Sequence, residues 1–135
     1  MTTQTKFRLT GPTIDAADPL RLARFYERLL GWSIVEQEGG GLRGKDAWAK
    51  LRSPDGFLKI EIQYEPHYVE PGWPSEPRSQ LMMMHLDIGT SDLDAGVAWA
   101  EECGAVQAAH QPQDDVRVMM DPEGHPFCLF LDPRA

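Results

Sequence analysis

The sequence predicts an α+β fold built from two tandem βαβββ modules, and two observations support this prediction. The expected elements run strand, helix and three strands, and this order occurs twice along the chain. The residues that bound the helices also occur twice: Asp18 and Asp92 precede them, and Gly31 and Gly104 follow them. Such repetition is typical of one structural unit used twice. Each unit alone is too small to bury its sheet well, so we expect one domain over residues 1–135.

Length and charge narrow the partners that we expect. The chain has 135 residues and a formal net charge of −8. Nucleic acid and anionic membrane surfaces are therefore not expected partners, because both attract basic proteins. The first residues contain no apolar signal-like stretch, and nowhere do about 18 apolar residues follow one another, so we expect a cytoplasmic protein. In that compartment Cys103 and Cys128 should be reduced.

The first module is expected over residues ~7–65, and its helix has the clearest signals. Asp18 is a residue type that caps helices, Pro19 suits the first turn, and Gly31 is a typical helix end. Apolar residues follow at helical spacing, as expected for one buried face: Leu22, Phe25, Tyr26, Leu29 and Leu30. Strands are expected at 7–15, 32–38, 46–53 and 57–65, with Pro54-Asp55-Gly56 as the turn between the last two.

A long irregular segment separates the modules. Residues 66–80 contain four prolines and no periodic pattern, which argues against a helix or a central strand. A loop of this length is usually a lid, a binding loop or a linker. The second module is then expected over ~81–132, with a helix over 91–104 and strands at 81–89, 105–110, 115–120 and 125–132.

Three stretches carry a resemblance to a known superfamily: DPLRLARFYERLLGW (18–32), HLDIGTSDLDAGVAWAEECGA (85–105) and DPEGHPFCLF (121–130). With these stretches and the paired module order, the chain resembles the vicinal oxygen chelate superfamily of glyoxalases, bleomycin-resistance proteins and extradiol dioxygenases. The resemblance implies a curled mixed sheet around a cleft, and in the enzymes a divalent metal held by the first and last strands of each module. Many members are dimers, so it also implies a homodimer.

Carried over position by position, the resemblance gives an incomplete set of metal ligands. His85 lies seven residues before Asp92, which matches the superfamily's histidine. The corresponding position of the first module is Gly11, which has no ligand atom. Cys128 occupies the last-strand position, where the superfamily has a carboxylate. A thiolate can bind zinc, but in the alternative reading Cys128 is a small buried apolar residue.

Strand alternation identifies the fourth position. Ile60 and Ile62 belong to the apolar face that should meet the helix, so Glu61 and Gln63 should face the cleft. Strict counting along the repeat points to Ile60 instead. On the alternation argument, we take Glu61 together with His85 as the candidate catalytic residues, and as ligands if a divalent metal binds. We expect no tightly bound metal.

The same alternation extends the candidate ligand-binding surface. Met83 and Asp87 should share the face of His85, although Asp87 could instead bond only to backbone at the strand end. Trp73 offers a stacking surface from the 66–80 loop, or it packs against the protein's own edge or a second subunit. The full candidate set is Thr13, Gln63, Trp73, Met83, Asp87, Cys128 and Phe130.

These residues predict a protein that binds a small organic molecule in its cleft without the full metal-ligand set. The alternative is a metal-dependent lyase, isomerase or dioxygenase of the same superfamily. Gly11 at the first-strand position favours binding, or chemistry that needs no metal, because it removes one ligand.

Overall fold

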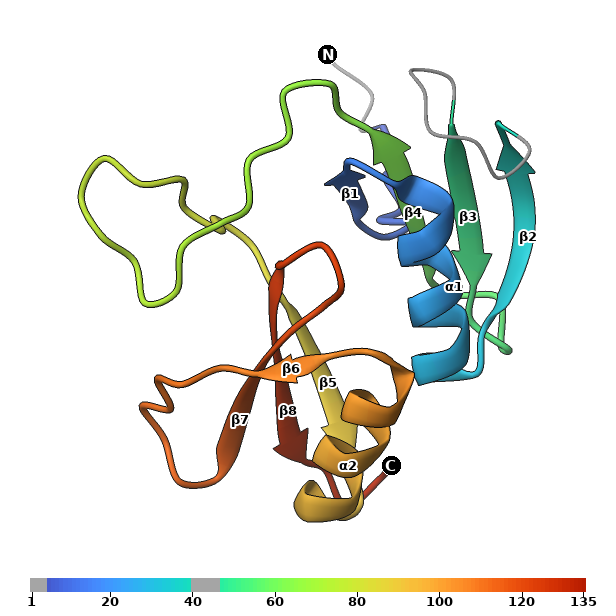
Figure 1. Cartoon of the computed structure of the whole chain (residues 1–135). Helices are drawn as coiled ribbons and strands as arrows, with labels where there is room; N and C mark the ends of the chain where they lie inside the picture. The colour runs from blue at the N-terminus through green and yellow to red at the C-terminus, as the bar shows by residue number, and fades with distance from the viewer. Residues whose placement is uncertain (1–4, 40–46) are drawn as a thin grey trace.

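The computed structural model of the protein describes residues 5–39 and 47–135. It confirms an α+β fold with two four-stranded mixed sheets, one in each of two tandem modules (Figure 1). In the first module the strand order is β1-β4-β3-β2, with β1 parallel to β4 and the other pairs antiparallel. Its elements are β1 (Thr13–Ala16), α1 (Pro19–Leu30), β2 (Ser33–Glu38), β3 (Trp48–Arg52) and β4 (Lys59–Tyr64).

The second module has the same topology. Its strand order is β5-β8-β7-β6, and β5 is parallel to β8 as β1 is to β4. The predicted duplication is therefore present in the strand pairing as well as in the element order. The elements are β5 (Leu86–Thr90), α2 (Leu93–Cys103), β6 (Val106–Gln107), β7 (Val116–Met120) and β8 (Pro126–Leu131).

Both helices begin and end where the sequence predicts. The carboxylates of Asp18 and Asp92 each accept a hydrogen bond from the backbone amide three residues on, at 3.3 and 3.0 Å. Gly31 and Gly104 end the helices with φ of 68° and 119°, where a side chain would be strained. Within residues 5–39 and 47–135, neither helix is long and apolar enough to cross a membrane.

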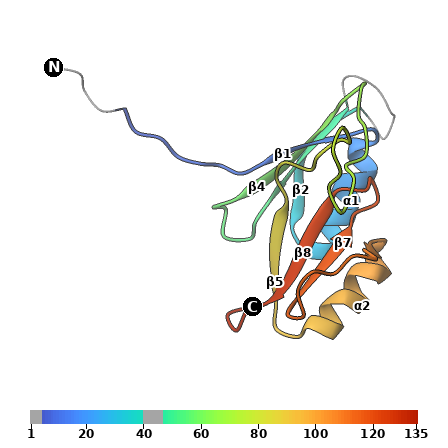
Figure 2. The same ribbon diagram turned by 90° about the vertical axis from the view of Figure 1, so that its left-hand side faces the viewer.

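The two modules share part of their hydrophobic core. Figure 2 shows both helices on the same side of the two sheets, so the opposite face of each sheet is open. α1 covers its own sheet with Leu22 and Tyr26, and it also sends Phe25 into the core of the second module. There the Phe25 ring lies 6.1 Å from the ring of Phe127. Burial of such aromatic side chains stabilises the contact between the modules.

The first strand is shorter than the predicted 7–15. Gly11 has a φ of 136°, and a Cβ at this position would collide with the backbone carbonyl of Lys59. Pro12 follows and lacks an amide donor. β1 therefore begins at Thr13, and residues 5–10 are exposed.

The first strand of the second module also begins later than the predicted 81–89. Its ladder with β8 starts at Leu86, opposite Phe127. Before that point Met83 has a φ of 56°, which is not a strand conformation. Alternation therefore does not hold before Leu86. The strand predicted at 105–110 is likewise reduced to the two residues of β6.

Candidate functional site

A pocket of about 490 Å³ lies where β1, residues 65–85 and the start of β8 come together. Its volume is within the range of about 300–1,000 Å³ that is common for small-molecule sites. The prolines of the 66–80 segment keep it irregular, so this part of the chain passes from β4 to β5 outside both sheets (Figure 1). Apolar lining residues include Ile14, Val69, Leu81, Met82, Met84 and Leu86, and polar ones include Thr13, Glu65, His67, Tyr68, His85 and His125.

One wall of the pocket rests on a buried carboxylate. The side chain of Asp121 has no exposed surface, and His125 Nδ1 lies 2.8 Å from its Oδ2. The Tyr26 hydroxyl donates to the same oxygen at 2.7 Å. Burial raises the pKa of Tyr26, and the negative charge of Asp121 raises it further. The phenol therefore remains a donor at all physiological pH values.

Tyr68 connects the 65–85 segment to the same wall. Its hydroxyl donates to the backbone carbonyl of Glu123 at 2.6 Å, and its ring lies 5.3 Å from the ring of His125. Burial raises the pKa of Tyr68, and the charges of Asp121 and Glu123 add to this effect. Tyr68 thus stays neutral and holds the segment against the β7–β8 turn.

Two of the predicted site residues, Thr13 and His85, line this pocket. Met83 is placed differently from the prediction: it is 85% exposed, whereas its neighbours Met82 and Met84 line the pocket. The late start of β5 explains the difference, because the predicted alternation from His85 back to Met83 required a strand.

Glu61 and Gln63 lie on the open face of the first sheet. Glu61 is paired with Lys59 at 3.0 Å and with Lys50 at 3.6 Å. The hydrogen bond from Lys59 lowers the pKa of Glu61, and burial opposes this to a smaller degree. Glu61 is therefore an ionised, ion-paired carboxylate. Gln63 donates to Asp15 Oδ1 at 2.8 Å.

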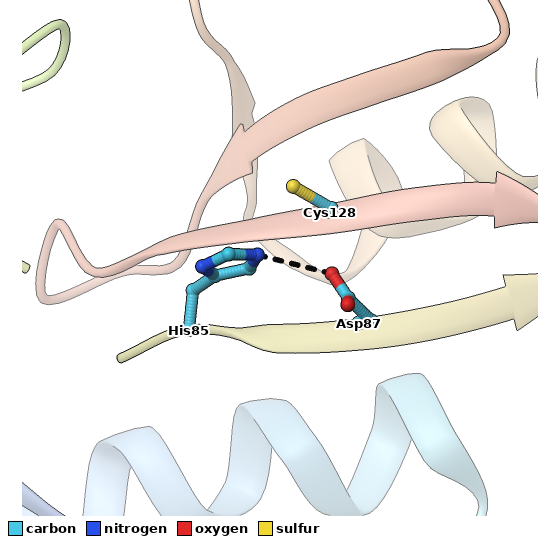
Figure 3. A group of neighbouring side chains, drawn as sticks. All are labelled: His85, Asp87 and Cys128. Atoms are coloured by element: carbon cyan, nitrogen blue, oxygen red, sulfur yellow. Dashed lines mark ion pairs between the residues drawn. The ribbon is translucent and has the colours of Figure 1, made fainter. Parts of the chain in front are cut away.

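His85 also belongs to a cluster with Asp87 and Cys128 at the open face of the second sheet (Figure 3). Asp87 and Cys128 are opposite each other on β5 and β8, and His85 Nε2 lies 3.1 Å from Asp87 Oδ1. One donor atom from each residue lies within 4.8 Å of the other two. Phe130, two residues further along β8, is partly buried.

The donor set of this cluster fits a zinc-type ion. Imidazole nitrogen, carboxylate oxygen and cysteine sulfur are the three protein donors that zinc uses, and the separations require only small side-chain movements. Without a metal, burial raises the pKa of Cys128, and the charge of Asp87 raises it further. The thiol is then protonated at neutral pH, so a metal would have to displace this proton. Glu61 is not part of the cluster that the described residues form.

The remaining candidate, Trp73, packs against the loop that precedes β7. Its indole nitrogen donates to the backbone carbonyl of His110 at 3.0 Å, and the two rings lie 5.8 Å apart. This placement corresponds to the alternative in which Trp73 packs against the protein's own edge.

Three residues that were not predicted from the sequence line the pocket: Tyr26, Met82 and Met84. Tyr26 is in the apolar stripe of α1, and the only available signal was that a buried phenol needs a hydrogen-bond partner. The two methionines had no signal of their own, because their orientation depends on where β5 begins.

The comparisons with known proteins agree with this architecture. The glyoxalase-like domain family matches residues 12–130. No curated protein matches the chain significantly. Among solved structures, the fosfomycin resistance protein FosX from Mesorhizobium loti superposes with a TM-score of 0.67 at 15% identity, over 95% of this chain and 94% of that one.

Two further structures show the same fold. TnmS3, an antibiotic binding protein from Streptomyces sp. CB03234, has a TM-score of 0.61 at 16% identity and covers 96% of this chain and 98% of its own. A glyoxalase family protein from Enterococcus faecalis has a TM-score of 0.62 at 20% identity, with 91% and 96% covered. The family match extends from before β1 into β8, and the chain therefore belongs to the glyoxalase-like domain family of the vicinal oxygen chelate superfamily.

Proposed function

We propose that this protein binds a small organic molecule in the pocket between β1, residues 65–85 and the start of β8. The observation that carries the proposal is the pocket itself, with a volume of about 490 Å³, an apolar lining and a few polar groups. Such a lining suits a mainly apolar ligand whose few polar atoms meet His67, His85 or Thr13. A solved structure of similar fold is an antibiotic binding protein, which supports a binding role.

Two adjacent methionines provide a matched test. Met84 lines the pocket and is 81% exposed, whereas Met83 is 85% exposed and is not among the lining residues. A glutamate at either position should leave the fold intact, because both side chains already contact water. A thermal-shift screen of small organic molecules should first yield a ligand that raises Tm, since binding to the folded state alone stabilises it by about 2.7 kcal/mol at 100 Kd.

Calorimetry with that ligand then separates the two variants. Met84→Glu should weaken binding about tenfold or more, because it places a charge against an apolar surface. Met83→Glu should bind like the unmodified protein. A screen without any stabilising compound, or equal losses in the two variants, would reject the pocket as the ligand site.

The second candidate is a metal-dependent activity of the lyase, isomerase or dioxygenase type. The cluster of His85, Asp87 and Cys128 supports it, because three suitable donors lie within 4.8 Å of one another. A divalent ion held there would polarise an oxygen of a bound substrate. The position of His85, at the border between the cluster and the pocket, would bring the ion close to the ligand.

Substitutions of Cys128, in the cluster, and of Cys103, outside it, test whether a metal binds at the cluster. Elemental analysis and calorimetric titration with Zn²⁺ should show one ion per chain in the unmodified protein. Cys128→Ser and Asp87→Asn should each lower the affinity at least tenfold, whereas Cys103→Ser on α2 should not. Zinc binding that survives Cys128→Ser unchanged would exclude the cluster as the metal site.

We also propose that the protein is a homodimer. Phe7 and Leu9 are 93% and 86% exposed on the N-terminal segment that runs away from the sheets (Figure 2). Exposed apolar side chains on an extended arm favour contact with a second copy. Sedimentation velocity should show a dimer that Phe7→Ser with Leu9→Ser converts to monomer, while Phe57→Ser in the exposed β3–β4 turn has no effect. A monomer in the unmodified protein would refute this.

A further inference from the structure

Both ring nitrogens of His125 are close to oxygen atoms, and the two oxygens belong to different modules. Nδ1 lies 2.8 Å from Oδ2 of Asp121, at the start of the β7–β8 turn in the second module. Nε2 lies 2.8 Å from the backbone carbonyl oxygen of Asp15, on β1 of the first module. The imidazole of His125 is therefore a bridge between the modules, and it lines the ligand pocket.

Neither of these oxygens can donate a hydrogen bond to the ring. A backbone carbonyl is only an acceptor, and so is an ionised carboxylate. The Asp121 carboxylate already receives hydrogen bonds from the Tyr26 hydroxyl at 2.7 Å and from the backbone amides of Glu123 and His125 at 2.9 and 3.0 Å. A neutral imidazole has one N–H group and can satisfy only one of the two contacts, whereas an imidazolium satisfies both.

We propose that His125 is an imidazolium in the folded protein and that its two donated hydrogen bonds form a pH-sensitive latch between the modules. The latch joins the β7–β8 turn to β1 and so fixes two walls of the pocket relative to each other. It lies beyond the proposed binding function, because it acts in the protein without a ligand.

The groups around the ring support the charged form. Burial disfavours the charge, but the hydrogen bond to Asp121, the negative charge of Asp121, the bond to the Asp15 carbonyl and the charge of Glu123 together raise the pKa of His125. Tyr68, from the 65–85 segment, faces the ring at 5.3 Å and is neutral. Tyr26, from α1, donates to the same oxygen of Asp121 that His125 contacts, and it is also neutral.

The direction of the pH effect follows from this raised pKa. A group that holds its proton more tightly in the folded state adds stability that is complete below its unfolded pKa of about 6.5. This stability is lost as the pH rises through the higher folded pKa. Above it, the neutral ring has one N–H group and loses its hydrogen bond either to Asp121 or to the Asp15 carbonyl.

Loss of the proton should loosen the joint without separating the modules. Hydrogen bonds that do not involve His125 also hold the turn to the rest of the described chain. The backbone amide of Asp18 donates to Glu123 Oε1 at 2.8 Å, and the Tyr68 hydroxyl donates to the Glu123 carbonyl at 2.6 Å. The Phe25–Phe127 contact in the core also remains.

Nuclear magnetic resonance of the histidine ring nitrogens tests the protonation state. At pH 7 His125 should show two protonated nitrogens, and His125→Gln should remove these signals. Asp121→Asn keeps the shape of the side chain but removes the charge, so it should lower the titration midpoint of this histidine. A neutral His125 tautomer at pH 7, or a midpoint that does not change in Asp121→Asn, would overturn the proposal.

Unfolding by urea between pH 6 and 9 tests the latch. Each unit by which the folded pKa of His125 exceeds the unfolded value should lower the folding equilibrium constant tenfold over this range. The part of this decrease below about pH 8 should be absent in His125→Gln and retained in His67→Gln, which changes another pocket histidine. The thiols of Cys103 and Cys128, whose pKa values burial raises, contribute to the decrease only toward pH 9. Equal decreases in the unmodified protein and in His125→Gln would refute the latch. Because no ligand is added, the result is independent of whether the pocket binds one.

Discussion

The turns that join the last two strands of each module have nearly the same backbone but very different surroundings. Ser53 begins the β3–β4 turn, and Asp121 begins the β7–β8 turn. In each turn the amide of the glycine donates to the carbonyl of this first residue, Gly56 to Ser53 at 2.9 Å and Gly124 to Asp121 at 2.8 Å. The two turns are thus copies of one structure.

Their side chains bond to different parts of the molecule. In the first turn the Ser53 hydroxyl donates to Asp55 at 2.6 Å and accepts from the Leu58 amide at 3.0 Å, so all of these contacts are local. In the second turn Asp121 is buried and accepts a hydrogen bond from the Tyr26 hydroxyl of the other module. The difference is that the first residue of one turn bonds only within that turn, whereas the first residue of the other bonds across the two modules.

The helices show the same asymmetry. Tyr26 lies eight residues after the cap Asp18, and the residue eight after Asp92 in α2 is Ala100. Ala100 is fully buried and has no polar atom in its side chain to extend toward the first module. The duplication therefore accounts for the fold, whereas substitutions in one copy of the helix and one copy of the turn account for the joint.

The largest expected effect on the free energy of unfolding comes from truncating Asp121, and the matched comparison is the same truncation of Ser53. Asp121→Ala leaves the Tyr26 hydroxyl and the His125 imidazolium buried without their acceptor, and loss of one partner of a buried pair costs about 3–5 kcal/mol. Ser53→Ala removes a buried hydroxyl whose hydrogen bonds all stay within its own turn, and the expected cost is about 1 kcal/mol. Urea unfolding at pH 6 measures both free energies.

A matched substitution shows whether charge or shape is responsible. Asp121→Asn keeps the size of the side chain and one acceptor oxygen, so it should destabilise less than Asp121→Ala. If Asp121→Ala and Ser53→Ala cost the same, the proposed difference between the turns is wrong.

The fold could be predicted because its signals are local. Asp18, Pro19 and Gly31 lie next to the helix ends that they determine, and each acts through its own backbone or the next turn. The same holds for Gly56 and Gly124, which adopt positive φ values of 79° and 89° in the two turns. Because the same cap and turn residues occur again in the second half of the chain, the second module could be predicted as well.

The site was harder to predict because its geometry depends on distant parts of the chain. The start of β5 is set by pairing with Phe127 on β8, and this start decides whether Met83 or Met84 faces the pocket. The Tyr26 hydroxyl finds its partner 95 residues away. Such contacts leave no periodic pattern. Alternation could therefore place Thr13, and spacing from the helix cap could place His85, but neither could place the residues around them.

The turn glycines provide a second, smaller comparison. Gly124→Ala and Gly56→Ala should each cost about 1–2 kcal/mol, because both place a Cβ at positive φ. A Cβ at Gly124 would also meet the side chain of Glu70, whereas at Gly56 it would meet nothing within 4 Å. Glu70 is exposed and can move, so Gly124→Ala should be the more destabilising variant by a few tenths of a kcal/mol in thermal unfolding. A larger loss in Gly56→Ala would contradict this order.

The smallest expected effect concerns Asp55, and its pH dependence is opposite to that of His125. The hydrogen bond from Ser53, followed by that from the Phe57 amide, lowers the pKa of Asp55. Its contribution to stability is therefore complete above the unfolded pKa of about 3.9 and is lost as the pH falls through the lower folded value. In urea unfolding, Asp55→Asn should be slightly less stable than the unmodified protein at pH 7, and this difference should shrink below pH 4. The decrease in the free energy of unfolding above neutral pH should be unchanged in Asp55→Asn, because that decrease arises from His125 at the β7–β8 turn. If Asp55→Asn also changed the decrease in stability above neutral pH, the two turns would be coupled. The distinction between a local turn and a turn that joins the modules would then be wrong.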